Sequence, residues 1–243
     1  MGLRKIQFII FILVPIINFG TNFFFPSAFS DDAKVLIQPA GYAFAIWGPI
    51  FLGMLIYSWF QLRPSRVESP QLKMATISGI AAGLASIAFV PISYTDIQWL
   101  SLINIIWHLI ALIILFVALR KQIQLETDTK TSWFYIPSQI YLGWICAATA
   151  ISVSLALTEI GFSPNIHTQV IFTVAIIGVL ATLGVFMTKQ KGLIIPIVFI
   201  WALIALIVEN GQYALIKYAS VVAIILLTLA VGYKLFKGQR LSY

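Results

Sequence analysis

Three polar residues are spaced so that they share one face of a helix inside an otherwise apolar stretch of the chain. Ser101, Asn104 and His108 stand at positions i, i+3 and i+7 within 97–119, which places them on one side of a helix. If that helix crosses a membrane, the polar groups turn away from lipid. The stripe therefore predicts either a ligand-contacting patch that includes the adjacent Trp107, or hydrogen bonds that join neighbouring helices. In the first case His108 would ligate or hydrogen-bond a tetrapyrrole.

The segment 38–50 combines prolines and glycines with large aromatic side chains at the start of another apolar stretch. It reads Gln-Pro-Ala-Gly-Tyr-Ala-Phe-Ala-Ile-Trp-Gly-Pro-Ile. Phe44 and Trp47 are three positions apart, so they share one face of a helix. The Pro-Ala-Gly entry indicates a fixed turn followed by a close backbone approach. This pattern predicts the rim of a pocket for a flat or bulky apolar ligand; the alternative is an interfacial aromatic belt with ordinary helix packing.

A second aromatic face lies within 133–157. Its members, at helical spacing, are Pro137, Tyr141, Trp144, Ala148 and Ser152. Large aromatic side chains above small ones leave a concave surface on that face. Together with Phe44 and Trp47 it would form an aromatic-walled slot, which is typical of small-molecule sites that are apolar with few polar groups.

The composition indicates that membrane-spanning helices position these residues. The chain is 60% hydrophobic and 9% charged, with a mean hydropathy of +0.99, which is typical of an integral membrane protein. Long unbroken apolar runs without a ten-residue alternating pattern favour helices over a β-barrel. We predict an all-α polytopic bundle of about eight transmembrane helices, at 6–25, 40–60, 74–92, 97–119, 133–157, 169–187, 192–208 and 214–235.

The net charge of +7 follows the expected membrane topology. With alternating connections, 13 of the 15 basic residues fall on one side, and only Lys34 and Lys217 fall on the other. The positive-inside rule then places both termini in the cytoplasm. Because membrane topology explains the excess of positive charge, we expect the lipid bilayer, and no nucleic acid, as a partner. We also expect the first helix to be retained, because the apolar run 6–25 is long for a signal peptide.

Other features concern packing and the space above the bundle. The loop 26–39 carries Asp31 and Asp32 and would cap a cavity. Gly79 and Gly83 form a small-xxx-small face, which predicts a close helix contact either within the bundle or in a homodimer. Prolines within or at the ends of spans are expected to kink helices: Pro15, Pro49, Pro91, Pro137 and Pro196.

Signatures of common enzyme classes do not occur in the sequence. It contains no phosphate loop, no His-Glu-x-x-His, no Gly-x-Ser-x-Gly and no run of intramembrane acids. The only other histidine, His167, is expected in a loop. Because no second imidazole or thiolate is placed to complete a coordination shell, we predict no metal site and no required cofactor. A conventional enzyme or an ion-coupled pump is therefore disfavoured.

Two of these segments resemble signatures of the translocator protein / tryptophan-rich sensory protein (TspO/MBR) family. The entry to the family's second helix is similar to Pro39-x-x-Tyr42-x-Phe44-x-x-Trp47-Gly48. The family's fifth-helix region is similar to Pro137-x-x-x-Tyr141-x-x-Trp144-x-x-x-Ala148. The chain departs from the family where its third span lacks an Asn-x-x-Trp element, which occurs instead in the fourth span, and where Ser152 replaces an expected Asn.

The resemblance covers about residues 6–157, and the remaining spans are similar to a longer branch of bacterial TspO-related membrane proteins. It implies a TspO/MBR-like five-helix membrane domain over 1–160 and a C-terminal three-helix membrane extension over 161–243. It also implies the bacterial cytoplasmic membrane as the location, and a homodimer as a common assembly.

The family's cavity accepts porphyrins, sterols or other hydrophobic molecules. The resemblance thus implies a membrane receptor or carrier that binds a porphyrin-, sterol- or isoprenoid-class ligand, a tetrapyrrole being one candidate. A transporter of a lipid-like substrate, gated by the last three spans, is the alternative; an enzyme that modifies a porphyrin is a third. Combining the residue patterns with the resemblance, the expected ligand-binding residues are Tyr42, Phe44, Trp47, Asn104, Trp107, His108, Tyr141 and Trp144.

Overall fold

The computed structural model describes residues 2–24, 35–63, 68–95, 97–125, 135–162, 165–190 and 192–238. These ranges contain α-helices, one 3-10 helix and no strand, which confirms the predicted all-α bundle of about eight helices. In chain order the elements are α1 Gly2–Phe24, η1 Gly41–Ile46, α2 Trp47–Phe60, α3 Pro70–Ser93, α4 Gln98–Leu125, α5 Tyr135–Glu159, α6 Ile166–Lys189, α7 Ile194–Asn210 and α8 Ala214–Phe236.

Within the described ranges, seven segments are long and apolar enough to cross a membrane. The second of these joins η1 to the 14-residue α2, giving a continuous span over Gly41–Phe60 of 20 residues. A 3-10 helix rises about 2.0 Å per residue, against about 1.5 Å for an α-helix, so η1 lengthens this span. The 17 residues of α7 lie at the short end of the spanning range.

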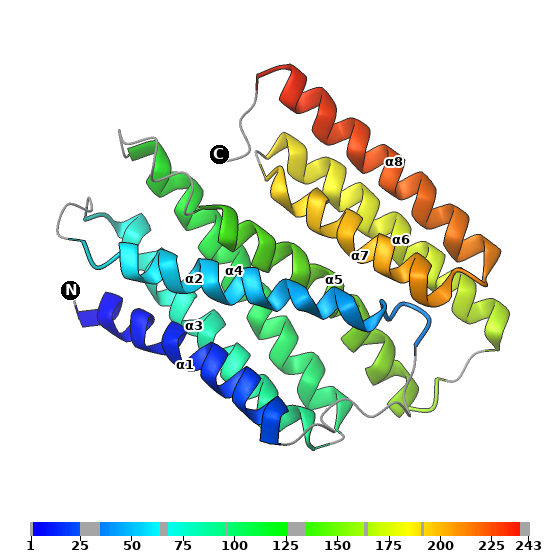
Figure 1. The fold of residues 1–243 in the computed structure, drawn as a ribbon, viewed down its shortest axis with the longest axis horizontal. Coiled ribbons are helices and arrows are strands. Elements are labelled where there is room, and N and C mark those ends of the chain that lie inside the picture. Colours follow the sequence, from blue (N-terminus) through cyan, green and yellow to red (C-terminus); the bar gives the residue numbers. More distant parts are fainter. Residues whose placement is uncertain are drawn as a thin grey trace.

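The first five helices form a closed ring (Figure 1). α1 packs on α2 and α3, α3 packs on α4, α4 packs on α5, and α5 closes the ring against α2. The last three helices pack on one another beside this ring, where α7 contacts both α5 and η1. The contacts thus group α1–α5 and α6–α8, while the domain boundary near residue 160 stays a prediction.

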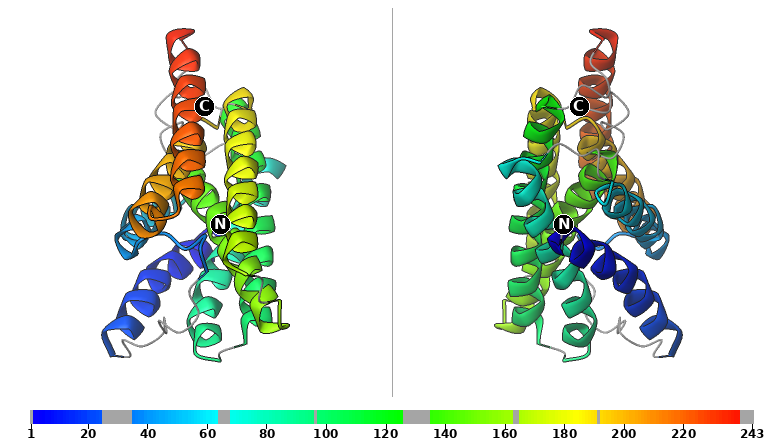
Figure 2. Two further views of the ribbon diagram at one scale, coloured as in Figure 1. Left: turned by 90° about the vertical axis from the view of Figure 1, so that its right-hand side faces the viewer. Right: turned by 90° about the vertical axis from the view of Figure 1, so that its left-hand side faces the viewer.

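The start of α1 and the end of α8 lie at the same end of the bundle (Figure 1), while the two helices themselves lie at opposite edges of it (Figures 1 and 2). Basic residues gather at this end, which we call the basic end. Those at helix termini within the described ranges are Arg4, Lys5, Arg63, Lys73, Arg120, Lys121, Lys189, Lys234 and Lys237. Arg4 also forms an ion pair with Glu68 there. Which side of the membrane this end faces stays a prediction.

The small-residue face of α3 packs against α1. A Cβ atom on Gly79 would overlap the Gln7 side chain, and one on Gly83 would overlap Ile10. The two glycines therefore let α1 and α3 approach closely inside the ring. Of the two contacts that the sequence allowed, the structure assigns this face to packing within the chain.

Three of the five prolines lie in first helical turns. Pro49, Pro137 and Pro196 are each the third residue of their helix, where a missing N–H breaks no intrahelical hydrogen bond. We expected these prolines to kink helices, but the three lie at helix starts and cause no kink there. Pro49 also offers no N–H to the carbonyl of Ala45, which accounts for the 3-10 geometry of the preceding turn.

We expect Gly83→Val to lower the free energy of unfolding by about 1–3 kcal/mol, because the added side chain overpacks the α1–α3 contact. The matched control is Gly178→Val in α6, where a Cβ atom meets nothing within 4 Å. Thermal unfolding in detergent micelles, followed by circular dichroism, measures both. Equal melting temperatures for the two variants would contradict this packing.

Candidate ligand-binding cavity

A cavity of about 780 Å³ lies within the α1–α5 ring, inside the size range of small-molecule sites. Its lining on α4 runs from Gln98 to His108, and its lining on α5 runs from Trp144 to Leu155. Both stretches belong to the half of each helix farther from the basic end. The cavity therefore occupies one half of the bundle along its length.

Aromatic side chains from η1, α2 and α5 form one wall of this cavity. Phe44 and Trp144 meet edge to face, with ring centroids 5.5 Å apart at 87°. Trp47 meets Trp144 at 6.4 Å and 85°, and it stacks on Phe51 at 5.1 Å and 28°. Edge-to-face and offset-stacked arrangements are the favourable ones for aromatic pairs. The two aromatic faces of the sequence thus meet across the α2–α5 contact.

The change of helix type at Trp47 keeps this wall in line. A 3-10 helix has about three residues per turn, so Phe44 lies directly above Trp47. In the α-helix that follows, residues four apart are neighbours on one face, so Phe51 continues the line. A close backbone approach does occur in this segment, because the N–H of Ala40 donates to the carbonyl of Ala205 at 3.1 Å. The glycines are not what allows it, since a Cβ atom on Gly41 or Gly48 would meet nothing within 4 Å.

Polar side chains on α3 and α4 supply hydrogen-bonding groups to the cavity. All three residues of the predicted stripe line it, together with Ser86 of α3. Asn104 donates its side-chain N–H to the carbonyl of Ala85, at 3.1 Å. The stripe therefore lines the cavity, and its Asn104 also joins two helices, while contact with a ligand stays a prediction. Among the described lining residues there is no Asp, Glu, Lys or Arg.

His108 and Tyr141 connect the polar wall to the aromatic wall. The His108 Nε2 atom lies 2.6 Å from the hydroxyl of Tyr141, and their rings meet edge to face at 4.9 Å and 85°. Tyr141 in turn meets the ring of Trp47 at 5.8 Å and 80°. Tyr141 is fully buried and does not line the cavity. Its hydrogen bond suits it to orient the ring of His108, and His108 does line the cavity.

Two residues of the expected site lie elsewhere. Tyr42 is 45% exposed and packs edge to face against Trp201, with centroids 5.4 Å apart. Trp107 is 58% exposed, because one residue along an α-helix is a rotation of about 100° away from the face that carries His108. Neither lines the cavity, so we leave both out of the site proposed below.

The cavity also has lining residues that the sequence analysis did not select. Phe51 continues the spacing of Phe44 and Trp47, so extending that face by one turn would have found it. Asn18 is a polar residue in an apolar span, and it donates to the carbonyls of Val14 and, on α3, Ser86. Phe89 also lines the cavity, and no spacing pattern in α3 distinguishes it.

The proposed cap of the cavity lies outside the described residues. Asp31 and Asp32 fall in the range 25–34, which the structure does not describe. The part of this connection that is described, from Val35 onward, leads into η1, and its Gln38 lines the cavity. The capping function of the acidic pair stays a prediction.

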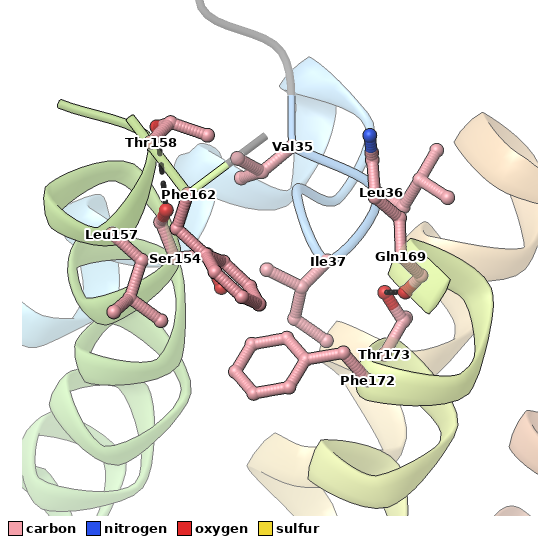
Figure 3. A pocket seen from close by; sticks show the side chains of 10 residues that line it. All are labelled: Val35, Leu36, Ile37, Ser154, Leu157, Thr158, Phe162, Gln169, Phe172 and Thr173. Atoms are coloured by element: carbon pink, nitrogen blue, oxygen red, sulfur yellow. Dashed lines mark hydrogen bonds between the residues drawn. The ribbon is translucent and has the colours of Figure 1, made fainter. Parts of the chain in front are cut away.

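A second, much smaller pocket of about 40 Å³ lies between α5, α6 and residues 35–37 (Figure 3). Ile37, Phe162 and Phe172 point toward one another in it. The Thr173 hydroxyl donates to the carbonyl of Gln169 at 2.9 Å, within its own helix. A space of this size holds one or two water molecules, so the large cavity is the candidate site for an organic ligand.

A family model described as TSPO-like protein matches residues 4–233. The chain belongs to this family. The match to the TSPO-like model runs through α8, well beyond residues 6–157 on which the sequence resemblance rested, so α6–α8 are part of the family pattern. It also identifies the apolar helices as those of a TspO-type integral membrane protein. No curated protein and no solved structure gave a significant match.

We expect Tyr141→Phe to lower the free energy of unfolding by about 0.5–1.5 kcal/mol, because it removes the hydrogen bond to His108. Tyr135→Phe is the matched control: Tyr135 is equally buried in α5, and its hydroxyl has no hydrogen-bond partner among the described residues. Thermal or denaturant unfolding in micelles measures both variants. A loss no larger for Tyr141→Phe than for Tyr135→Phe would show that the bond does not stabilise the fold.

Proposed function

We propose that this protein is a membrane receptor or carrier that binds a hydrophobic small molecule in the cavity of the α1–α5 ring. The observation that carries the proposal is the edge-to-face set of Phe44, Trp47 and Trp144 along one wall of a cavity of about 780 Å³. Aromatic side chains give much contact area and few rotatable bonds, and are favoured in binding sites for this reason.

The chemistry of the two walls indicates the class of ligand. A flat apolar body fits against the aromatic side chains of α2 and α5, with hydroxyl, carbonyl or ring N–H groups toward Asn104 and His108 on α4. Porphyrins and sterols have such a shape, and an isoprenoid has an apolar surface that would also pack on the aromatic side chains. Since the described lining residues include no cationic side chain, the carboxylates of a porphyrin would lie at the mouth of the cavity, in water.

The packing beyond the cavity favours binding without passage through the bundle. On the basic-end side of His108, the ring is filled by buried side chains: Tyr57, Leu112, Leu115, Phe116 and Tyr135. Phe116 and Tyr135 stack there, with centroids 5.2 Å apart at 25°. By the positive-inside rule the basic end faces the cytoplasm, so we propose that the cavity receives its ligand from the opposite side of a bacterial cytoplasmic membrane.

We expect the purified protein to bind protoporphyrin IX, and Trp47→Ala and Trp144→Ala to weaken binding by about tenfold or more, the loss typical of buried aromatic contacts. The absorbance of the porphyrin reports binding without relying on tryptophan emission. Trp107→Ala is the matched control, because Trp107 lies on the outer face of α4. Unchanged affinity in both cavity variants would refute the site.

The rate at which ligand crosses a membrane distinguishes a receptor from a transporter. In proteoliposomes loaded with protoporphyrin IX or a fluorescent sterol, we expect binding but no release faster than in protein-free vesicles, because the half of the ring toward the basic end is filled. The release rate, compared with that of vesicles carrying Trp47→Ala, is the measurement. Release that needs the wild-type cavity would establish the transporter instead.

A further inference from the structure

Three hydrogen bonds join α7 to the entry of the second span. The backbone N–H of Ala40 donates to the carbonyl of Ala205, at 3.1 Å. The indole Nε1–H of Trp201 donates to the carbonyl of Ala43, at 3.1 Å. The side-chain N–H of Asn210 donates to the carbonyl of Gln38, at 3.0 Å. We call residues 38–47 the entry segment.

These contacts give backbone groups of the entry segment hydrogen-bond partners outside it. The first N–H groups of a helix have no intrahelical acceptor, and no side chain caps η1. The carbonyl of Ala205 provides the acceptor for the N–H of Ala40. Trp201 adds an aromatic contact, because its ring meets Tyr42 edge to face at 5.4 Å and 85°.

The other side of the same segment lines the cavity. Gln38, Gly41, Phe44 and Trp47 all contribute to the lining, while Ala40, Tyr42 and Ala43 bind α7. A segment of ten residues thus contacts the ligand cavity on one side and the α6–α8 group on the other. A displacement of α7 would move the aromatic wall with it, since both are attached to the same short helix.

We propose that Trp201 and Asn210 of α7 are positioning residues, which hold the entry segment so that Phe44 and Trp47 face the ligand. The α6–α8 group therefore sets the affinity of a cavity to which it contributes no lining residue among those described. This inference rests on the proposed function for its effect on affinity, but the restraint on the entry segment is independent of any ligand. By linkage, a ligand that packs on Phe44 and Trp47 also stabilises the α7 contact.

The test uses Trp201→Phe, which keeps an aromatic ring beside Tyr42 and removes the indole donor. Trp107→Phe is the matched control, because that side chain is exposed on the outer face of α4. Amide hydrogen exchange in micelles, without ligand, measures opening of the entry segment. We expect exchange within 38–47 to rise about fivefold in Trp201→Phe, as for the loss of one hydrogen bond, while amides of Ile50–Phe60 and the whole control stay unchanged.

The second measurement is the dissociation constant for protoporphyrin IX, which we expect to rise about fivefold in Trp201→Phe and not in Trp107→Phe. Unchanged exchange in the entry segment overturns the inference. Raised exchange with unchanged affinity also overturns it, since the contact would then restrain the segment without positioning the wall. If the wild-type protein binds no porphyrin while exchange rises, the restraint by α7 is supported and the proposed function fails for this ligand.

Asn210→Ala provides an independent variant in case Trp201→Phe does not fold. It removes only the hydrogen bond to the carbonyl of Gln38, at the last residue of α7. The same two measurements apply, and we expect the largest change in exchange at Ala40 and Gly41. A variant that folds and shows wild-type exchange there overturns the inference.

Discussion

Backbone hydrogen bonding inside the membrane is the constraint on which the rest of this structure depends. An α-helix pairs its own N–H and C=O groups, so most of the chain needs no outside partner. The entry segment is an exception: Pro39 lacks an N–H group, Pro49 follows shortly after the segment, and η1 between the two prolines is a 3-10 helix. Helix α7 gives outside partners to three backbone groups of this segment through Ala205, Trp201 and Asn210. Irregular backbone at such depth is tolerated where it is buried in protein or lines a cavity, and here it does both.

The same irregularity affects the cavity wall. In an unbroken α-helix, Phe44, Trp47 and Phe51, at positions i, i+3 and i+7, would share one face, but Trp47 would lie about 60° around the axis from Phe44. With the change from 3-10 to α geometry at Trp47, the spacing of three and then four residues matches the local number of residues per turn. Phe44 and Trp47 therefore both meet Trp144 of α5, and Phe51 stacks on Trp47 one turn further along.

The helix count, the shared face of Ser101, Asn104 and His108, and the two aromatic faces follow from hydropathy and spacing, which depend on neighbours in the sequence. What could not be predicted depends on distant partners. Tyr42 packs on Trp201, a residue 159 positions later, and nothing in its local sequence indicates that contact. The α1 partner of Gly79 and Gly83 was undetermined for the same reason, since a small-residue face specifies a close approach but no particular helix.

The described polar contacts around the cavity involve no carboxylate, ammonium or guanidinium group. The described lining lacks Asp, Glu, Lys and Arg, and the contacts that hold the site are Asn104 to Ala85, His108 to Tyr141 and Trp201 to Ala43. A charged pair in this position would carry a large desolvation penalty, whereas a neutral hydrogen bond carries a small one. The consequence for recognition follows from the same physics. In the proposed site, a ligand that buried a polar group without reaching a polar lining group such as Asn104 or His108 would lose a hydrogen bond to water and regain none. The polar lining groups would therefore discriminate among ligands that fit the aromatic wall equally well.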